Sequence, residues 1–218
     1  MDHALSLRHI NQEQKQMQLV GMLDSPYVRR VAVSLRLLGL SFEHRSISVF
    51  STFQQFREIN PVVKAPTLVC DDGTLLMDST LIIDYAETLA GRSLMPSGLA
   101  ERQHALKVLG LALAACEKSV QIVYERKLRP PEKQHAPWVD RVRGQLGAAY
   151  AGLQAEVRKL PVPSTEGTIG QGALTSAVAW SFTQLVLPDL IAPADYPSLA
   201  AFAADVEKLP AFVALPQV

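Results

Sequence analysis

The pair Ser25-Pro26 stands between an apolar run and the start of a helical pattern. Serine is a favoured N-cap and proline a favoured first helical residue, so the plain interpretation of Ser25 is a helix cap. A cap and a ligand-facing hydroxyl are compatible, because loops at the carboxyl ends of strands hold ligands in open α/β sheets. A helix N-terminus also offers unpaired N–H groups and partial positive charge to an anion.

A second polar pair, Asp78-Ser79, opens another helical pattern. Its plain interpretation is again capping, with the aspartate favoured by the helix dipole. The functional interpretation is a site for a ligand that carries both an ammonium and a carboxylate. The acidic side chain would accept the ammonium, and the serine hydroxyl and backbone N–H groups would bind the carboxylate.

A third motif, Asn60–Thr67, places Ala65-Pro66 directly before an apolar run. A proline that enters a strand is usually a turn or edge residue. Only about 5–6% of X-Pro bonds are cis, so the spacing alone does not indicate a cis bond here.

Hydrophobic periodicity predicts the elements that position these motifs. Strands are expected over Met17–Leu23, Phe42–Ile47, Thr67–Cys70 and Thr74–Met77, and helices over 28–38, 53–59 and about 79–89. The first two strands need a crossover helix and are therefore parallel, whereas a tight turn makes the last two antiparallel. The order β-α-β-α-β-β-α indicates an open α/β unit in which helices cover a four-stranded sheet.

After residue 91 the chain becomes rich in alanine, and the pattern predicts helices only. One long helix carries apolar residues three and four apart from Leu106 to Val123 and ends before Pro130-Pro131. Further helices are expected at about 137–159, 175–187 and 198–208. On the long helix Glu117, Gln121 and Tyr124 are candidate polar residues of a pocket, although facing solvent or the bundle core fits them equally well.

Composition excludes several classes of function. The 218 residues are 48% hydrophobic, which indicates a folded protein, and Lys+Arg and Asp+Glu both number 21, which argues against non-specific nucleic-acid binding. No apolar run approaches the roughly 20 residues that span a bilayer, and the polar start lacks a signal segment, so we expect a cytoplasmic protein without a membrane partner. The histidines show no metal-ligand spacing, and the two cysteines are too few for a disulfide framework.

The three motifs together, in this order and spacing, resemble the glutathione transferase family. The stretches that carry the resemblance are SPYVRRVAVSLRLLGLSFE and NPVVKAPTLVCDDGTLLMDSTLIIDYAE, and it is strong over 18–90. Bacterial members with a Ser-Pro-aromatic motif are the most similar. The resemblance implies α/β plus all-α architecture: a flexible extension (1–16), a thioredoxin-like glutathione-binding domain (17–91), a linker (92–98) and an all-helical domain lining the electrophile pocket (99–218).

The resemblance also implies roles for single residues. Ser25 matches the activating hydroxyl and is the catalytic candidate, while Ala65 precedes the proline, Pro66, that is cis in the family. Asp78 and Ser79 match the acidic-Ser pair that holds the γ-glutamyl end of glutathione. The basic side chain of Lys64 could attract the glycyl carboxylate of glutathione. The implied glutathione-binding residues are Ser25, Lys64, Ala65, Pro66, Asp78 and Ser79.

Departures from the family pattern limit how the ligand thiol can be activated and which reactions are expected. Gly21-Met22-Leu23 has no tyrosine where other members place an activating one, and serine at position 25 argues against mixed-disulfide chemistry. Asp24 is expected to point away from the ligand sulfur, whose ionisation it would oppose. In the helical half, Thr175 is expected to cap a helix, with Val178 replacing the usual acid at a cost of about 1 kcal/mol.

The resemblance implies a cytoplasmic homodimeric detoxification enzyme that conjugates glutathione, a co-substrate, to small hydrophobic electrophiles without a metal. Two alternatives stay open. One is a glutathione-binding or protein-interaction module without turnover, and the other is a glutathione-dependent isomerase or peroxidase.

Overall fold

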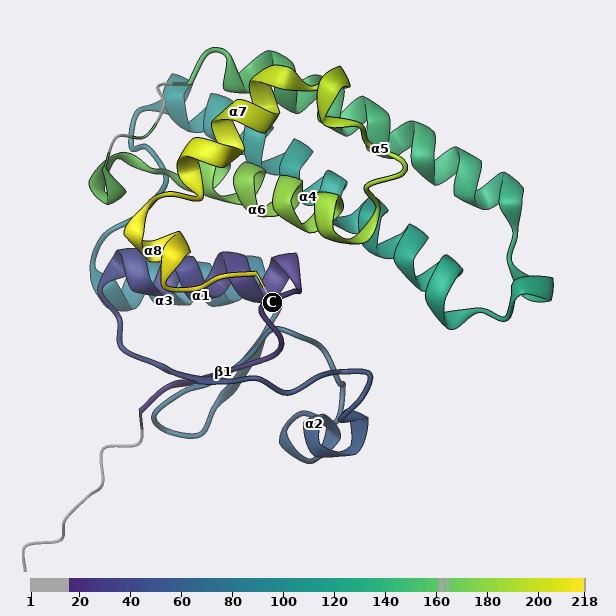
Figure 1. Ribbon diagram of the computed structural model, residues 1–218. Coiled ribbons are helices and arrows are strands. Elements are labelled where there is room, and N and C mark those ends of the chain that lie inside the picture. The colour runs from purple at the N-terminus through teal and green to yellow at the C-terminus, as the bar shows by residue number, and fades with distance from the viewer. Residues whose placement is uncertain (1–15, 161–162, 164, 218) are drawn as a thin grey trace, which may run out of the picture.

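A four-stranded mixed sheet forms the base of the N-terminal half in a computed structural model that describes residues 16–160, 163 and 165–217 (Figure 1). Its strands are β1 (Gln18–Val20), β2 (Glu43–Arg45), β3 (Thr67–Val69) and β4 (Leu75–Met77), in the spatial order β2-β1-β3-β4. β1 pairs in parallel with β2 and antiparallel with β3, and β3 pairs antiparallel with β4. The parallel β1-β2 pair and the antiparallel β3-β4 pair are those that the sequence predicts, whereas the sequence does not predict the β1-β3 pairing, and the strands are shorter than expected.

Three helices flank this sheet: α1 (Pro26–Leu38) and α3 (Ser79–Ala90) lie on one face and α2 (Phe53–Ile59) on the other (Figure 1). α1 begins where expected, with Pro26 in its first turn, and ends at Gly39, whose φ of 77° is the left-handed conformation that glycine adopts freely. Its buried apolar face packs into a core that continues into the helical half without a break.

The C-terminal half is helical throughout its described residues. Its helices are α4 (Leu99–Leu128), α5 (Ala136–Val157), α6 (Gln171–Val186), α7 (Pro197–Val206) and α8 (Pro210–Val213), with 3-10 turns at Pro131–Lys133, Glu166–Thr168 and Pro193–Asp195. α4 packs along α5 and α6, while α6 and α8 contact α1 of the other half. The expected fold class, a thioredoxin-like domain followed by an all-helical domain, is confirmed.

The buried face of α4 differs from the face that its large apolar residues suggest. Four of its eight buried residues are small (Ala112, Ala115, Cys116 and Ser119), because close helix packing against α5 and α6 leaves little room. Leu106 is half exposed, and Val120 instead lines a cleft. The phase of a long helix with apolar residues on several sides cannot be fixed by spacing alone.

α6 begins four residues earlier than the sequence predicts. The helix begins at Gln171, with Gly170 as its N-cap, so Thr175 lies inside the helix and caps nothing. Its hydroxyl is buried without a hydrogen-bond partner in the described part of the chain. Val178 is fully buried in the core and does not replace an acid of a capping box.

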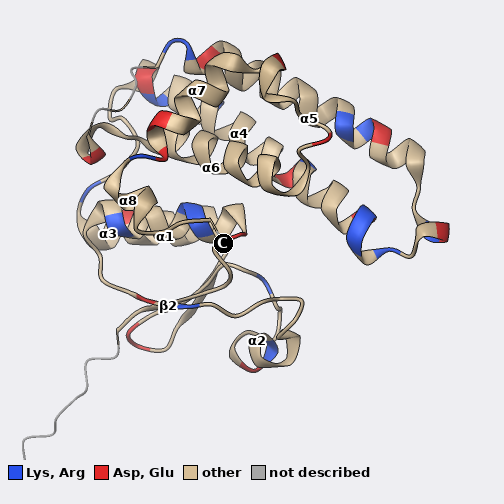
Figure 2. Ribbon diagram, viewed as in Figure 1, with Lys and Arg blue, Asp and Glu red and all other residues tan. Residues whose placement is uncertain are grey.

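The N-terminal extension expected over 1–16 lies outside the described residues, apart from Gln16. Within the described ranges, basic and acidic residues are interspersed along the ribbon of both halves (Figure 2).

Candidate functional site

A cleft of about 960 Å³ opens between the two halves of the molecule. The N-terminal half contributes the start of α1, the loop after β2, the loop before β3 and the start of α3, and the C-terminal half contributes α4 and α6. Its charged and polar lining residues are Asp24, Ser25, Tyr27, Ser48, Lys64, Asp78, Ser79, Glu117, Tyr124 and Lys127. The structure brings all six sequence-predicted site residues to this one cleft.

Ser25 is the N-cap of α1, as its plain interpretation requires, and it also lines the cleft. Its Oγ accepts a long hydrogen bond of 3.5 Å from the backbone N–H of Val28. That contact uses a lone pair of the hydroxyl and leaves its hydrogen free for a ligand. Capping and ligand binding are therefore compatible at this residue.

The loop before β3 lies against the start of α1 because a glycine permits it. A Cβ on Gly21 would stand 2.5 Å from a methyl of Val28 and 3.3 Å from Cβ of Ala65, and the φ of Gly21 is +141°. The Ala65-Pro66 bond is cis. This loop thus places Ala65 beside the residues that present Ser25.

Buried Asn60 holds the same loop from behind. Its Nδ2 donates to Oγ1 of Thr67 at 2.8 Å, and its Oδ1 accepts from the N–H of Val62 at 3.0 Å. The Thr67 hydroxyl donates in turn to the carbonyl of Lys64 at 2.8 Å. The backbone that faces the cleft is fixed by side chains that the sequence motif itself supplies.

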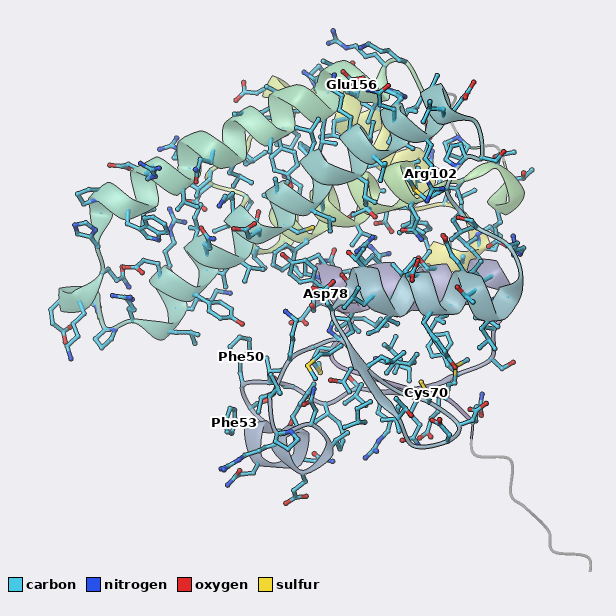
Figure 3. All side chains as sticks on the ribbon, turned by 180° about the vertical axis from the view of Figure 1, so that it is seen from behind. Phe50, Phe53, Cys70, Asp78, Arg102 and Glu156 are labelled. Carbon is cyan, nitrogen blue, oxygen red and sulfur yellow. The ribbon has the colours of Figure 1, made fainter. Side chains whose placement is uncertain are left out.

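Asp78 and Ser79 line the cleft at the start of α3. Asp78 has a φ of 72°, an uncommon conformation for a non-glycine residue that recurs at ligand sites. Its Oδ1 accepts from the N–H of Thr80 at 2.9 Å, and its Oδ2 lies 3.9 Å from Nζ of Lys64. Ser79 is buried, whereas Asp78 and Lys64 are half exposed and accessible to a ligand. Figure 3 shows Asp78 between the sheet and the helical half.

An aromatic pair bridges the two halves at the cleft, and one of its members, Phe50, is not predicted from the sequence. Phe50, from the loop after β2, meets Tyr124 of α4 edge to face, with ring centroids 5.5 Å apart. Tyr124 and Glu117 line the cleft as two of the three polar candidates on the long helix, whereas Gln121 is not among its lining residues and donates to Glu117. The signal for Phe50 is weak, because an aromatic residue in a loop has no periodicity.

Burial shifts the pKa values of titratable groups in the cleft and close to it. It raises the pKa of the Asp24 carboxyl, which lines the cleft beside Ser25. It also raises the pKa of the Tyr27 hydroxyl, with further contributions from Cys116, Glu117 and Asp78, so this phenol stays protonated. Burial raises the pKa of the Cys116 thiol to about 12, which keeps it neutral and unreactive.

Comparisons with known proteins find relatives of this chain by sequence and by fold. Residues 19–94 match the model of the glutathione S-transferase N-terminal domain. The uncharacterized GST-like protein YibF of Escherichia coli is 29% identical over 63% of this chain and 68% of its own. Glutathione transferase GST 23 of Zea mays is 31% identical over 42% of each chain.

Solved structures extend the match to the helical half. A glutathione transferase family member from Pseudomonas fluorescens Pf-5, crystallised with bound glutathione, is 28% identical, covers 93% of this chain and 100% of its own, and has a TM-score of 0.78. Together these findings show that the chain is similar to glutathione transferases, in sequence over its N-terminal half and in fold over both halves.

Among the described residues, no helix combines the length and the hydropathy that crossing a membrane requires. No group of three or more His, Cys, Asp or Glu side chains there is arranged to hold a metal ion.

Proposed function

We propose that the protein is a glutathione transferase that adds the glutathione thiolate to small hydrophobic electrophiles. The observation that carries the proposal is the convergence of Ser25, the Ala65-Pro66 turn and the Asp78-Ser79 pair on one cleft. The support from relatives is that the Pseudomonas fluorescens structure of the same fold holds glutathione. The tripeptide would lie along the N-terminal wall, and Lys64 would attract its glycyl carboxylate.

Ser25 would act as a hydrogen-bond donor to the sulfur. An ordinary cysteine thiol has a pKa of about 8.5, and lowering it to about 6.5 needs roughly 2.7 kcal/mol of preferential thiolate stabilisation. A hydrogen bond to a charged group supplies about 1.5–3 kcal/mol, and a helix N-terminus adds about 0.3–1 kcal/mol. One hydroxyl above the start of α1 is therefore sufficient. The thiol proton would leave to water, and the thiolate would form a new S–C bond with the electrophile. In a substitution the leaving group would depart with its bonding electron pair; in an addition to a C=C bond the π electrons would move to the neighbouring carbon, which would take up a proton from water.

The remainder of the cleft suits an apolar co-substrate. Its wall is completed by side chains that cannot form strong polar contacts: Met22, Ile47, Val49, Phe50, Val62, Val63, Val120, Val123, Leu128, Phe182 and Val186. Burying an apolar group against them gains about 25 cal/mol per Å². This surface supports hydrophobic electrophiles as the substrate class and detoxification as the role.

The test is Ser25→Ala, compared with Ser41→Ala, an exposed serine outside the cleft. We expect Ser25→Ala to raise the pKa of bound glutathione and to lower kcat/KM by roughly 10- to 100-fold, while glutathione still binds. Thiolate absorbance against pH and calorimetry measure these quantities. Retention of the thiolate signal in Ser25→Ala would remove Ser25 from the proposed role.

The same measurements separate the alternatives. Binding of glutathione without turnover of any electrophile would indicate a sensor, and absence of binding heat at millimolar glutathione would indicate an interaction module. Glutathione-dependent cis-trans isomerisation of a substrate, with no conjugate formed, would indicate an isomerase. Glutathione-dependent reduction of peroxides, again with no conjugate formed, would indicate a peroxidase.

A further inference from the structure

Tyr27 brings to the cleft a hydroxyl group that no described residue of the chain uses. It is the second residue of α1, two positions after Ser25, and it lines the cleft while its ring packs against the core. Burial and neighbouring charges shift the pKa of its hydroxyl, and no hydrogen bond to a described residue contributes. A tyrosine hydroxyl withdrawn from water usually has a partner, as that of Tyr150 has in the carbonyl of Ala179 at 2.9 Å. Tyr27 therefore offers an unused hydrogen-bond donor in the cleft.

The hydroxyl of Tyr27 lies where the two halves of the cleft meet. Burial raises its pKa most, and ionisable groups on α4 and at the start of α3 raise it further: Cys116, Glu117 and Asp78. Glu117 and Asp78 both line the cleft, and because such charge effects fall off with distance, the hydroxyl is close to both helices. Its oxygen is not sealed inside the described part of the protein, in contrast to Nε of Arg30. A group bound between the two halves can therefore accept a hydrogen bond from it.

The environment of Tyr27 makes it a neutral donor. Its raised pKa means that the phenol donates its hydrogen without releasing it at neutral pH. The nearby carboxylates have cationic partners of their own: Asp78 has Lys64 at 3.9 Å, and Glu117 has Lys118 at 2.9 Å. A neutral donor fixed in the first turn of a helix suits an oxygen that becomes negative during the reaction, because its hydrogen bond strengthens in the transition state.

We propose that Tyr27 is a catalytic residue that donates to the carbonyl oxygen of an α,β-unsaturated ketone or aldehyde while glutathione adds to it. The sulfur forms a bond with the β-carbon, the π electrons of the C=C bond form a new C=C bond to the carbonyl carbon, and those of the C=O bond go to its oxygen. The Tyr27 hydroxyl donates to this enolate oxygen and keeps its proton. The α-carbon then takes a proton from water, which restores the C=O bond. The inference rests on the proposed function and specifies its electrophile class.

The length of such a substrate fits the spacing of the two hydroxyl groups along the chain. Its carbonyl oxygen is three bonds from the carbon that the sulfur attacks. This separation suits a donor that lies two residues from Ser25 and lines the same cleft. The apolar side chains of the cleft would cover the remainder of the substrate.

The experiment compares the wild type with Tyr27→Phe, which removes only the hydroxyl oxygen, and with the matched control Tyr196→Phe, at a half-buried tyrosine outside the cleft. The electrophiles are benzylideneacetone, an unsaturated ketone, and hexyl iodide, which has no oxygen and releases iodide. We expect Tyr27→Phe to lower kcat for the ketone roughly 10- to 100-fold and kcat for the iodide less than about twofold. The pKa of the bound thiol, the Kd of glutathione and the unfolding temperature should not change. Tyr196→Phe should leave both reactions unchanged.

Equal loss of kcat for both electrophiles in Tyr27→Phe would overturn the inference, because a structural role disturbs both reactions. A raised thiol pKa or weaker glutathione binding in Tyr27→Phe would also overturn it, since the hydroxyl would then act on glutathione; these two measurements decide if the iodide is not a substrate. A loss confined to Tyr124→Phe, at the other tyrosine that lines the cleft, would assign the donor there instead. A wild type that conjugates the iodide but not the ketone would refute the electrophile class alone. A wild type that binds no glutathione, or binds it and conjugates neither electrophile, would refute the proposed function itself.

Discussion

At the scale of single residues, polar side chains at helix starts carry both folding and chemistry. Ser25 caps α1 and Asp78 caps α3, and both line the cleft. The reason is geometric: a helix start leaves backbone N–H groups unpaired, so a side chain that accepts from one of them lies next to others that a ligand can use. A serine or aspartate recognised as a cap is thus already placed for binding.

Phe50 offers the sharpest residue-level prediction for the electrophile end of the cleft. Phe50→Ala removes the edge-to-face contact with Tyr124 across the two halves, which is worth about 0.5–1.5 kcal/mol. We expect KM for a hydrophobic electrophile to rise roughly two- to tenfold, with KM for glutathione unchanged. Phe53→Ala is the matched control, because Phe53 is comparably exposed nearby but does not line the cleft (Figure 3). Equal effects of the two substitutions would contradict this assignment.

The sequence predicts which N-terminal residues lie together at the cleft better than it predicts the C-terminal ones, for a physical reason. Ser25, Ala65-Pro66 and Asp78-Ser79 lie in short loops next to strands, so the sheet order alone brings them to one edge. Tyr124 lies far along a helix of 30 residues, where a small error in phase changes the side that a residue faces. Arg30 looks like a surface charge in the sequence, and only tertiary packing reveals its burial.

At the scale of elements, α6 shows how packing overrides a local signal. Thr175 has the residue type of a cap, yet the helix continues through it because the N-terminal turn from Gln171 packs against neighbouring elements. Gln171 at the start of α6 also contacts α1, because its Nε2 donates to Oγ of Ser34 at 2.8 Å. The start of this helix is therefore set by contacts that lie far apart in the sequence.

The burial of Val178 allows the capping interpretation of Thr175 and Val178 to be tested. If Val178 were the missing acid of a cap, Val178→Asp would add about 1 kcal/mol of stability. In the structure the aspartate would be buried without a partner, and we expect a loss of roughly 3–5 kcal/mol in the free energy of unfolding. Leu185→Asp, on the exposed side of the same helix, should change stability by less than about 1 kcal/mol. Urea titrations of the two variants measure the difference, and a stabilised Val178→Asp would restore the capping interpretation.

At the scale of the whole molecule, a cluster of charges ties two long helices together at a distance from the cleft (Figure 3). Glu156 of α5 accepts from Nζ of Lys107 at 2.6 Å, from His104 at 2.7 Å and from Nζ of Lys159 at 3.1 Å. These hydrogen bonds lower the pKa of Glu156 from 4.5 to about 2, and the one from Lys107 has the largest effect. A carboxylate with a lowered folded-state pKa stabilises the fold above its unfolded pKa, and this contribution is lost as pH falls through the folded pKa.

The contribution of Glu156 to the free energy of unfolding should therefore be visible in acid unfolding. We expect the wild type to exceed Glu156→Gln in stability at neutral pH, and this difference to shrink between about pH 4.5 and pH 2. Glu58→Gln, at an exposed carboxylate that forms no ion pair in the described residues, should show no comparable convergence. Chemical denaturation at a series of pH values makes the measurement. A pH-independent difference between wild type and Glu156→Gln would contradict the cause assigned to the shift.

The outer face of α3 is a candidate interface for the homodimer that the family resemblance implies. Leu81, Tyr85 and Leu89 follow one another at four-residue spacing, so they form one stripe, and they are 63%, 37% and 50% exposed. An apolar stripe of this kind favours association, because removing it from water is stabilising. We expect the wild type to sediment as two chains, and Leu81→Glu combined with Leu89→Glu to sediment as one, because paired stripes would bring the added carboxylates together. Val213→Glu, at an equally exposed apolar residue elsewhere, should leave the dimer intact. A monomeric wild type would refute the dimer, whereas a double variant that still dimerises would refute only the face assigned to it.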